Sequence, residues 1–228
     1  NVGAICHANE ETFSKFRRMG FTTYPLGRQG VKLGGVFIKG GTGSIVANFR
    51  KGGYFEMISI YNNWLPNGGY KKTLKKQGER LTKCTLALSD AKEEAKRLKA
   101  LGKSVFGPLE FRRVFTSETK GKQDARFSIM VYPFPSDHPV AVAGTEHLTP
   151  DITWQNDLLD HPNGAVILSN ALLAVDNPDE TAALYGKIFR EAFAAEGKTR
   201  VCHLRNGSRL TLIAHADLAD ETQDVKPD

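Results

Sequence analysis

Two polar side chains interrupt apolar, strand-like segments at places where chemistry could occur. Glu56 lies in the segment 54–61, and a buried carboxylate is costly unless a cation or a metal ion pairs with it. His147 ends the segment 140–147, and an imidazole can act as a metal ligand, a general base or a hydrogen-bond donor. The alternatives are a glutamate on a solvated sheet face and a histidine that holds the following loop in place.

The alternation of side chains along a strand assigns these residues to faces. Tyr54, Glu56 and Ile58 share one face of their strand, since successive side chains point to opposite sides. By the same rule Glu146 points away from His147, so only one of the two can enter a shared cavity. We favour His147 as the one that enters the cavity.

The segment 144–165 gathers further polar and aromatic residues without helical spacing. Trp154 is expected to be a pocket wall or a core anchor. His161 precedes the turn-forming residues 162–164, which favours a structural role. The glycine-rich segment 40–44 does not open a helix, so a hairpin turn is favoured there over a phosphate-binding loop.

Composition excludes some classes of protein. No segment approaches the roughly 18 consecutive apolar residues of a membrane span, so no membrane association is expected. The three cysteines are an odd number at wide spacings, which argues against a disulfide framework and indicates a reducing, cytoplasmic setting. The net charge of +6 is concentrated in the segments 71–83 and 112–126. The first segment has only Tyr70 beside it, so a solvated linker is favoured over a nucleic-acid-binding surface, and an anion-attracting rim around a pocket is the third interpretation.

The order of elements repeats along the chain. Asn9, Asp90 and Asn177 are each predicted to cap a helix that follows a strand. Around these helices we expect strands at residues 2–6, 21–24, 34–39, 44–50, 54–61, 84–88, 107–115, 126–133, 140–147, 166–175, 200–204 and 209–214. Residues 62–80, rich in proline, glycine and lysine, are expected to form a loop.

This order predicts an α+β protein with paired βαβββ modules. The modules are expected to form an open, curled, mainly antiparallel sheet around a cleft, where a ligand can bind. The expected domain boundaries are 1–164 for the two modules, at about 1–64 and 80–150, and 165–228 for a third, partial β-α-β-β module and a C-terminal tail. The partial module could pack on the first two or pair with a second copy of the chain in a homodimer.

The chain resembles the vicinal-oxygen-chelate superfamily, and within it the glyoxalase-like domain proteins. The resemblance rests on the segments 1–5 and 13–21, 53–59, 86–102, 146–150 and 161–165. It implies paired βαβββ modules and a divalent metal ion held by histidine and glutamate. The activities that it implies include isomerisation, ring cleavage, epoxide opening and drug sequestration.

The resemblance also implies roles for particular residues. Glu56 matches the metal-binding glutamate of the family, and His147 lies at the equivalent place in the second module. Two further ligand positions depart from the family pattern. One holds Asn1 in place of histidine, and the other falls at Lys83 or Cys84, where histidine or glutamine is common. Asparagine is a poor ligand for zinc or iron, and a protonated lysine is not a ligand.

Two functions follow as hypotheses. In the first, the protein is a lyase, isomerase or dioxygenase that acts on a small oxygen-rich substrate in the cleft. Glu56 and His147 would then bind zinc, iron, manganese or nickel, or act directly as a base and a hydrogen-bond donor, while Trp154 and Asn1 contact the substrate. In the second, the same cleft binds or sequesters a small molecule without catalysis.

Overall fold

The computed structural model describes residues 1–7, 9–134, 138 and 140–218, which divide into two compact units. The first unit spans Asn1–Ile167, and the second begins at Leu168. Within the described residues, no helix is long and apolar enough to cross a membrane.

The first unit contains two successive β-α-β-β-β segments joined by a short helix. The first segment comprises β1 (Val2–Cys6), α1 (Asn9–Arg18), β2 (Gly27–Leu33), β3 (Val36–Asn48) and β4 (Tyr54–Ile60). After α2 (Tyr70–Gln77), the second comprises β5 (Arg80–Ala87), α3 (Ala91–Ala100), β6 (Phe106–Ser117), β7 (Gly121–Val131) and β8 (Ala141–His147). The connector that follows contains α4 (Pro150–Thr153) and the short 3-10 helix η1 (Asn156–Leu158).

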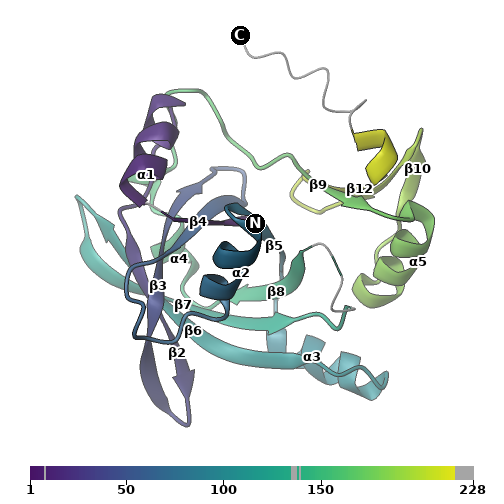
Figure 1. Ribbon diagram of the computed structural model, residues 1–228, viewed down its shortest axis with the longest axis horizontal. Coiled ribbons are helices and arrows are strands. Elements are labelled where there is room, and N and C mark those ends of the chain that lie inside the picture. Colours follow the sequence, from purple (N-terminus) through teal and green to yellow (C-terminus); the bar gives the residue numbers. More distant parts are fainter. Residues whose placement is uncertain (8, 135–137, 139, 219–228) are drawn as a thin grey trace. The chain divides into compact units, whose positions relative to one another are not determined.

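The eight strands form a closed barrel in the order β1-β4-β3-β2-β6-β7-β8-β5 (Figure 1). Within each segment the first and last strands pair in parallel, β1 with β4 and β5 with β8. Between the segments, β1 pairs antiparallel with β5 and β2 with β6. The predicted α+β class is confirmed, but the expected open sheet is corrected to a closed one, because both inter-segment pairings form and no strand edge remains.

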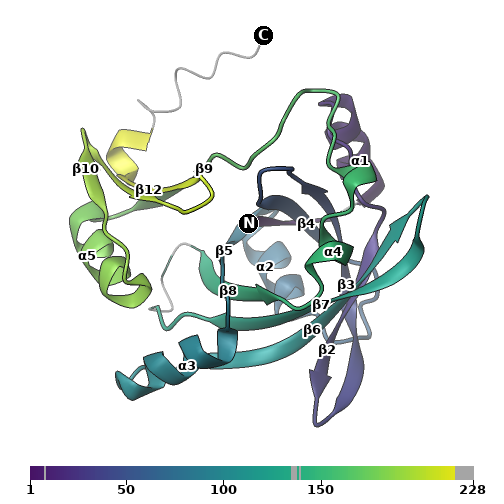
Figure 2. The same ribbon diagram turned by 180° about the vertical axis from the view of Figure 1, so that it is seen from behind.

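Helices cover the outer faces of this barrel. α1 covers a buried cluster formed by Cys6, Phe13, Ile45 and Met57, against which Phe55 packs. α3 contacts β6, β7 and β8 (Figure 2), and its side chains Ala91, Ala95 and Leu98 are buried.

The second unit forms a separate four-stranded sheet in the order β10-β11-β12-β9. Its elements are β9 (Asn170–Val175), α5 (Pro178–Phe189), β10 (Ala194–Glu196), β11 (Thr199–His203), β12 (Arg209–Ala214) and the short 3-10 helix η2 (His215–Asp217). The partial β-α-β-β module expected here is therefore wrong, because the short strand β10 follows the helix and makes the order β-α-β-β-β. β10 has only three residues, all exposed, so it carries no alternating apolar pattern.

Three further expectations within the first unit are wrong. Residues 21–24 form no strand, residues 34–50 contain the single strand β3 instead of two, and the expected loop 62–80 contains α2. Gly40 and Gly41 lie within β3 and do not form a turn. The loop that follows β4 packs directly against Gly41. A Cβ at Gly41 would lie 2.2 Å from the carbonyl oxygen of Asn62 and 2.8 Å from that of Leu65.

Candidate ligand-binding site

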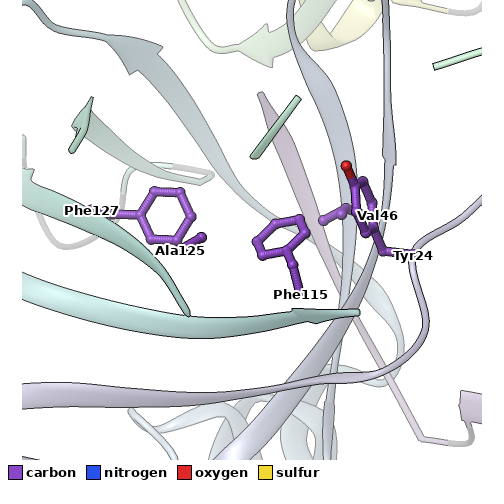
Figure 3. Packing of buried hydrophobic residues seen from close by; sticks show 5 residues of the cluster. All are labelled: Tyr24, Val46, Phe115, Ala125 and Phe127. Carbon is purple, nitrogen blue, oxygen red and sulfur yellow. The ribbon is translucent and has the colours of Figure 1, made fainter. Parts of the chain in front are cut away.

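The interior of the barrel contains a cavity of about 1020 Å³. One wall is apolar and comes from β6 and β7, with Phe111, Phe115, Phe127 and Ile129 among the lining residues. Figure 3 shows Phe115 and Phe127 in the buried cluster that they form with Tyr24, Val46 and Ala125. α2 contributes the more polar side chains of Tyr70, Thr73 and Gln77 to the lining.

The opposite wall carries the carboxylate of Glu56, which is 5% exposed. Along β4, Tyr54, Glu56 and Ile58 line the cavity, whereas Phe55 and Met57 pack in the cluster beneath α1. Glu56 therefore occupies the inward face of its strand, since strand side chains alternate between faces. The solvated-face alternative for this residue does not fit its burial.

Three neighbouring side chains contact the Glu56 carboxylate, and a fourth orients one of them. Lys83 Nζ lies 2.6 Å from Oε2. Ser44 Oγ donates to Oε1 at 2.7 Å, and Gln29 Nε2 donates to the same oxygen at 2.9 Å. Gln29 is oriented in turn by Thr42, whose hydroxyl donates to Gln29 Oε1 at 2.8 Å. Each carboxylate oxygen is thereby satisfied in a buried place where an unpaired charge would be costly.

A second cation, which is buried, lies near this cluster. Arg113 is 4% exposed and lines the cavity, and its Nη2 donates to the carbonyl oxygen of Ser44 at 2.6 Å. Its guanidinium lies 4.3 Å from the centroid of the Phe115 ring, a favourable cation–π arrangement. The polar end of the cavity thus holds one carboxylate and two cations.

These charges set the protonation of the group. Although burial opposes ionisation of Glu56, the nearby Lys83 and Arg113 cations hold the pKa of its carboxyl at about 2. Burial likewise opposes the charge of Lys83, but the Glu56 carboxylate raises the pKa of that ammonium above its ordinary value. Burial lowers the pKa of Arg113, yet an arginine keeps its proton in proteins. At neutral pH the pair is an ion pair, and Glu56 is a weak base.

His147 lies in a different, smaller pocket of about 50 Å³. Its ring is surrounded by those of Trp154 at 4.6 Å, Phe127 at 5.1 Å and Tyr54 at 5.9 Å between centroids. Burial lowers the pKa of His147 to about 4, so the ring is neutral at pH 7. Its Nδ1 is buried and has no hydrogen-bond partner among the described residues.

The structure brings three of the four sequence-predicted site residues together. Asn1, His147 and Trp154 line the small pocket. Asn1 Oδ1 and Trp154 Nε1 are also buried, and neither has a hydrogen-bond partner among the described residues. Glu146 lies on the opposite side of β8, where its carboxylate accepts from the backbone N–H of Ala91 at the start of α3.

Glu56, the fourth residue, does not join them. Strand register aligns Glu56 on β4 with Gly3 on β1, Lys83 on β5 and Ala141 on β8. His147 lies six residues beyond Ala141 on β8, and its ring contacts that of Tyr54, two residues before Glu56 on β4. The two side chains line different pockets, although both pockets share Asn1 and Tyr54 among their lining residues.

The donors around Glu56 do not fit a divalent metal ion. Such an ion needs several carboxylate, imidazole or thiolate ligands, and no group of three or more such side chains comes together among the described residues. The ammonium of Lys83 lies directly against the carboxylate, and a protonated amine offers no lone pair to a metal.

His161 has a structural place in the connector. Its Nδ1 accepts the backbone N–H of Thr22 at 3.0 Å, so Nε2 carries the proton and donates to the carbonyl oxygen of Asn48 at 3.0 Å. The ring is 8% exposed and packs edge-on against Phe21 and Phe49. This contact fastens the connector to the end of β3.

Sequence reasoning missed most of the side chains that surround Glu56. Both Lys83 and Arg113 lie in the segments predicted to be solvated, and Lys83 also lies at a ligand position of the family resemblance, but both side chains line the cavity. A signal for Arg113 was present, since Phe111, Arg113 and Phe115 share one strand face that is otherwise aromatic. For Gln29, Thr42 and Ser44 no local signal exists, because their strands meet Glu56 only in the folded barrel.

Comparisons with known proteins agree with this architecture. A hypothetical protein from Staphylococcus aureus aligns at 14% identity and a TM-score of 0.62, covering 93% of this chain and 84% of that one. A mutant 4-hydroxymandelate synthase from Streptomyces coelicolor aligns at 14% identity and a TM-score of 0.53, covering 93% of this chain and 61% of that one. At these identities the similarity shows the fold alone.

In sequence, no curated protein matches the chain. The family model described as a glyoxalase-like domain matches residues 2–189, which is most of the chain. This match, together with the barrel of two β-α-β-β-β segments, assigns the family. The chain belongs to the glyoxalase-like domain family.

Proposed function

We propose that the protein binds a small, oxygen-bearing, partly apolar molecule inside the barrel. The observation that carries the proposal is a cavity of about 1020 Å³ with an aromatic wall on one side and the Glu56–Lys83 ion pair on the other. Ligand cavities are commonly about 300–1000 Å³, largely apolar, with a few fixed polar groups that orient the ligand. This cavity has both features.

The charges at the polar end favour a ligand with an electron-rich oxygen. Glu56, Lys83 and Arg113 together carry one negative and two positive charges, so a carbonyl or carboxylate is favoured there over a cation. Lys83 is also the more accessible member of the ion pair, with 22% of its side chain exposed against 7% for Glu56. A ligand oxygen therefore meets the ammonium before it meets the carboxylate.

The second candidate is an enzyme of lyase, isomerase or dioxygenase type. Its supporting observation is the small pocket, where neutral His147 has a free ring nitrogen and which shares lining residues with the main cavity. A ligand that reached from one pocket into the other could give up a proton to His147. We favour binding without catalysis, because Glu56, with a pKa of about 2, and His147, with a pKa of about 4, are both poor bases at neutral pH.

Binding is testable with anilinonaphthalene sulfonate, an aromatic anion that fluoresces in apolar sites. We expect saturable binding by the wild-type protein and a loss of about tenfold or more in affinity for Ile129→Trp, which fills part of the cavity. Leu101→Trp, on the exposed end of α3, is the matched control and should bind like wild type. Equal binding by all three proteins would place the probe elsewhere and contradict the proposal.

A separate measurement addresses catalysis. Small 2-oxo and 2-hydroxy acids are incubated with the protein in deuterium oxide, and exchange of their carbon-bound protons is followed by NMR. Protein-dependent exchange that His147→Leu abolishes would favour the enzyme. Absence of exchange, combined with saturable probe binding, would favour a binding protein.

A further inference from the structure

Three neighbouring strands hold Lys83, Gly3 and Glu56 at one level of the barrel. Gly3 on β1 is aligned with Lys83 on β5 and with Glu56 on β4. A Cβ at Gly3 would lie 2.4 Å from Cε and 2.6 Å from Cγ of Lys83, so the lysine side chain passes directly over this glycine. The missing side chain at Gly3 thus opens the path by which Lys83 crosses one strand and reaches Glu56.

The ammonium that arrives by this path is the counter-ion of the carboxylate. Lys83 Nζ lies 2.6 Å from Glu56 Oε2, while Ser44 and Gln29 donate to Oε1. Lys83 is thus the cation that contacts the carboxylate directly, whereas Arg113 bonds to the carbonyl oxygen of Ser44. In a metal-binding barrel that cation would be the divalent ion, whereas here it is covalently attached to β5.

We propose that the Lys83 ammonium is a built-in cation that replaces a divalent metal ion in this cavity. It neutralises Glu56 permanently and presents its other N–H donors to an oxygen atom of the ligand. An ammonium has three donors, of which one faces Glu56, and the lysine side chain is partly exposed and lines the cavity. The second role depends on the proposed ligand binding, whereas the first does not.

The replacement changes what the site can do to a ligand. A lysine ammonium carries one charge instead of two and has no vacant orbital, so it orients an oxygen by hydrogen bonds without acting as a Lewis acid. A carbonyl or carboxylate oxygen satisfies the ammonium N–H groups, whereas an apolar ligand would leave them unpaired. The ligand class is therefore an oxygen-bearing molecule that is recognised without metal.

Metal titration tests the first role. The full-length protein, freed of metal with a chelator, is titrated calorimetrically with Zn²⁺ and with Mn²⁺. We expect no equimolar binding by the wild type, weak binding by Lys83→His through the new imidazole and the Glu56 carboxylate, and loss of that binding in the double variant Lys83→His, Glu56→Gln. Circular dichroism confirms that each variant is folded before titration.

Two outcomes would overturn the proposal. One is equimolar binding by the wild type that Glu56→Gln weakens about tenfold or more, since the ammonium would then not exclude the ion. The other is a folded Lys83→His variant that gains no Glu56-dependent binding, since Lys83 would then not stand at the cation position.

Probe binding tests the second role separately. We expect Lys83→Met to bind anilinonaphthalene sulfonate about tenfold or more weakly than wild type, and Lys83→Arg to retain most of the affinity because it keeps the charge. Equal affinity for Lys83→Met and wild type would refute the second role. If the probe does not bind the wild-type cavity at all, the proposed function fails together with that role, while the metal titration still decides the first.

Discussion

At the scale of single residues, Glu56 and His147 have opposite environments. Glu56 is surrounded by cations and donors that stabilise its charged form, whereas His147 is surrounded by aromatic rings that disfavour its charged form. Both residues could be selected from the sequence, because a carboxylate and an imidazole stood out in apolar strands. The environments of these two residues could not be predicted from the sequence, because Lys83 and Trp154 approach them from other elements.

The environment of His147 predicts how stability depends on pH. Its pKa is about 4 in the folded protein and about 6.5 when unfolded, so only the unfolded chain takes up this proton as the pH falls below 6.5. The stabilisation is complete above pH 6.5 and is lost between pH 6.5 and 4. We expect chemical denaturation to show that wild type loses on the order of 2 kcal/mol more over this range than His147→Leu. If the free energy of unfolding depended on pH in the same way for both proteins, His147 would not lie in the apolar environment described.

At the scale of secondary-structure elements, glycines decide how side chains cross between strands. Gly27 on β2 resembles Gly3, since a Cβ there would lie 2.7 Å from Nε of Arg113 and 2.2 Å from the carbonyl oxygen of Val114. Lys83 passes over Gly3, and Arg113 passes beside Gly27 to reach Ser44 on β3. Both crossings bring a cation from the second β-α-β-β-β segment to the polar wall of the first.

The crossing at Gly3 gives a test by double-mutant cycle. Gly3→Ala should displace the Lys83 side chain and destabilise the protein by about 1–3 kcal/mol, because the added methyl overlaps the lysine. In the Lys83→Ala background the overlapping atoms are absent, so Gly3→Ala should change the free energy of unfolding by less than about 0.5 kcal/mol. Equal effects in both backgrounds would mean that Gly3 serves another purpose.

Elements that local interactions decide could be predicted from the sequence, whereas elements that depend on distant parts of the chain could not. Asp90 and Asn177 cap their helices as predicted, each accepting two backbone N–H groups, because capping is decided within four residues. Continuity of β3 through Gly41 depends on a loop that packs from residues 62–66, so local turn signals misled the prediction. Helix α5 ends at Phe189 because Arg190 adopts a positive φ of 58°, which no sequence pattern indicated.

At the scale of the whole molecule, the cavity belongs to one unit. Its lining residues lie between Asn1 and Thr145, all within the unit that ends at Ile167. The eight strands of that unit also close their own barrel, so its sheet needs no strand from elsewhere. Pairing with a second copy of the chain, considered from the sequence, stays a prediction.

This division predicts that the first unit binds ligand by itself. A protein comprising residues 1–167 should fold cooperatively and bind anilinonaphthalene sulfonate within about threefold of the affinity of the full chain. Fluorescence titration of both proteins measures this, and the Ile129→Trp change made in the shorter protein is the control. A folded 1–167 protein with no saturable binding would show that the second unit contributes to the site.

Both proposals depend on a permanent Glu56–Lys83 ion pair at the polar end of the cavity. NMR of protein labelled at its lysine side chains tests it most directly, with the Lys83 signal assigned from the Lys83→Arg variant. Because the Glu56 carboxylate raises the pKa of Lys83, we expect its signal to remain that of the charged ammonium at about pH 11, where ordinary lysines near 10.4 have largely lost their proton. A Lys83 signal that titrates together with the exposed lysines, or below them, would contradict the permanent ion pair.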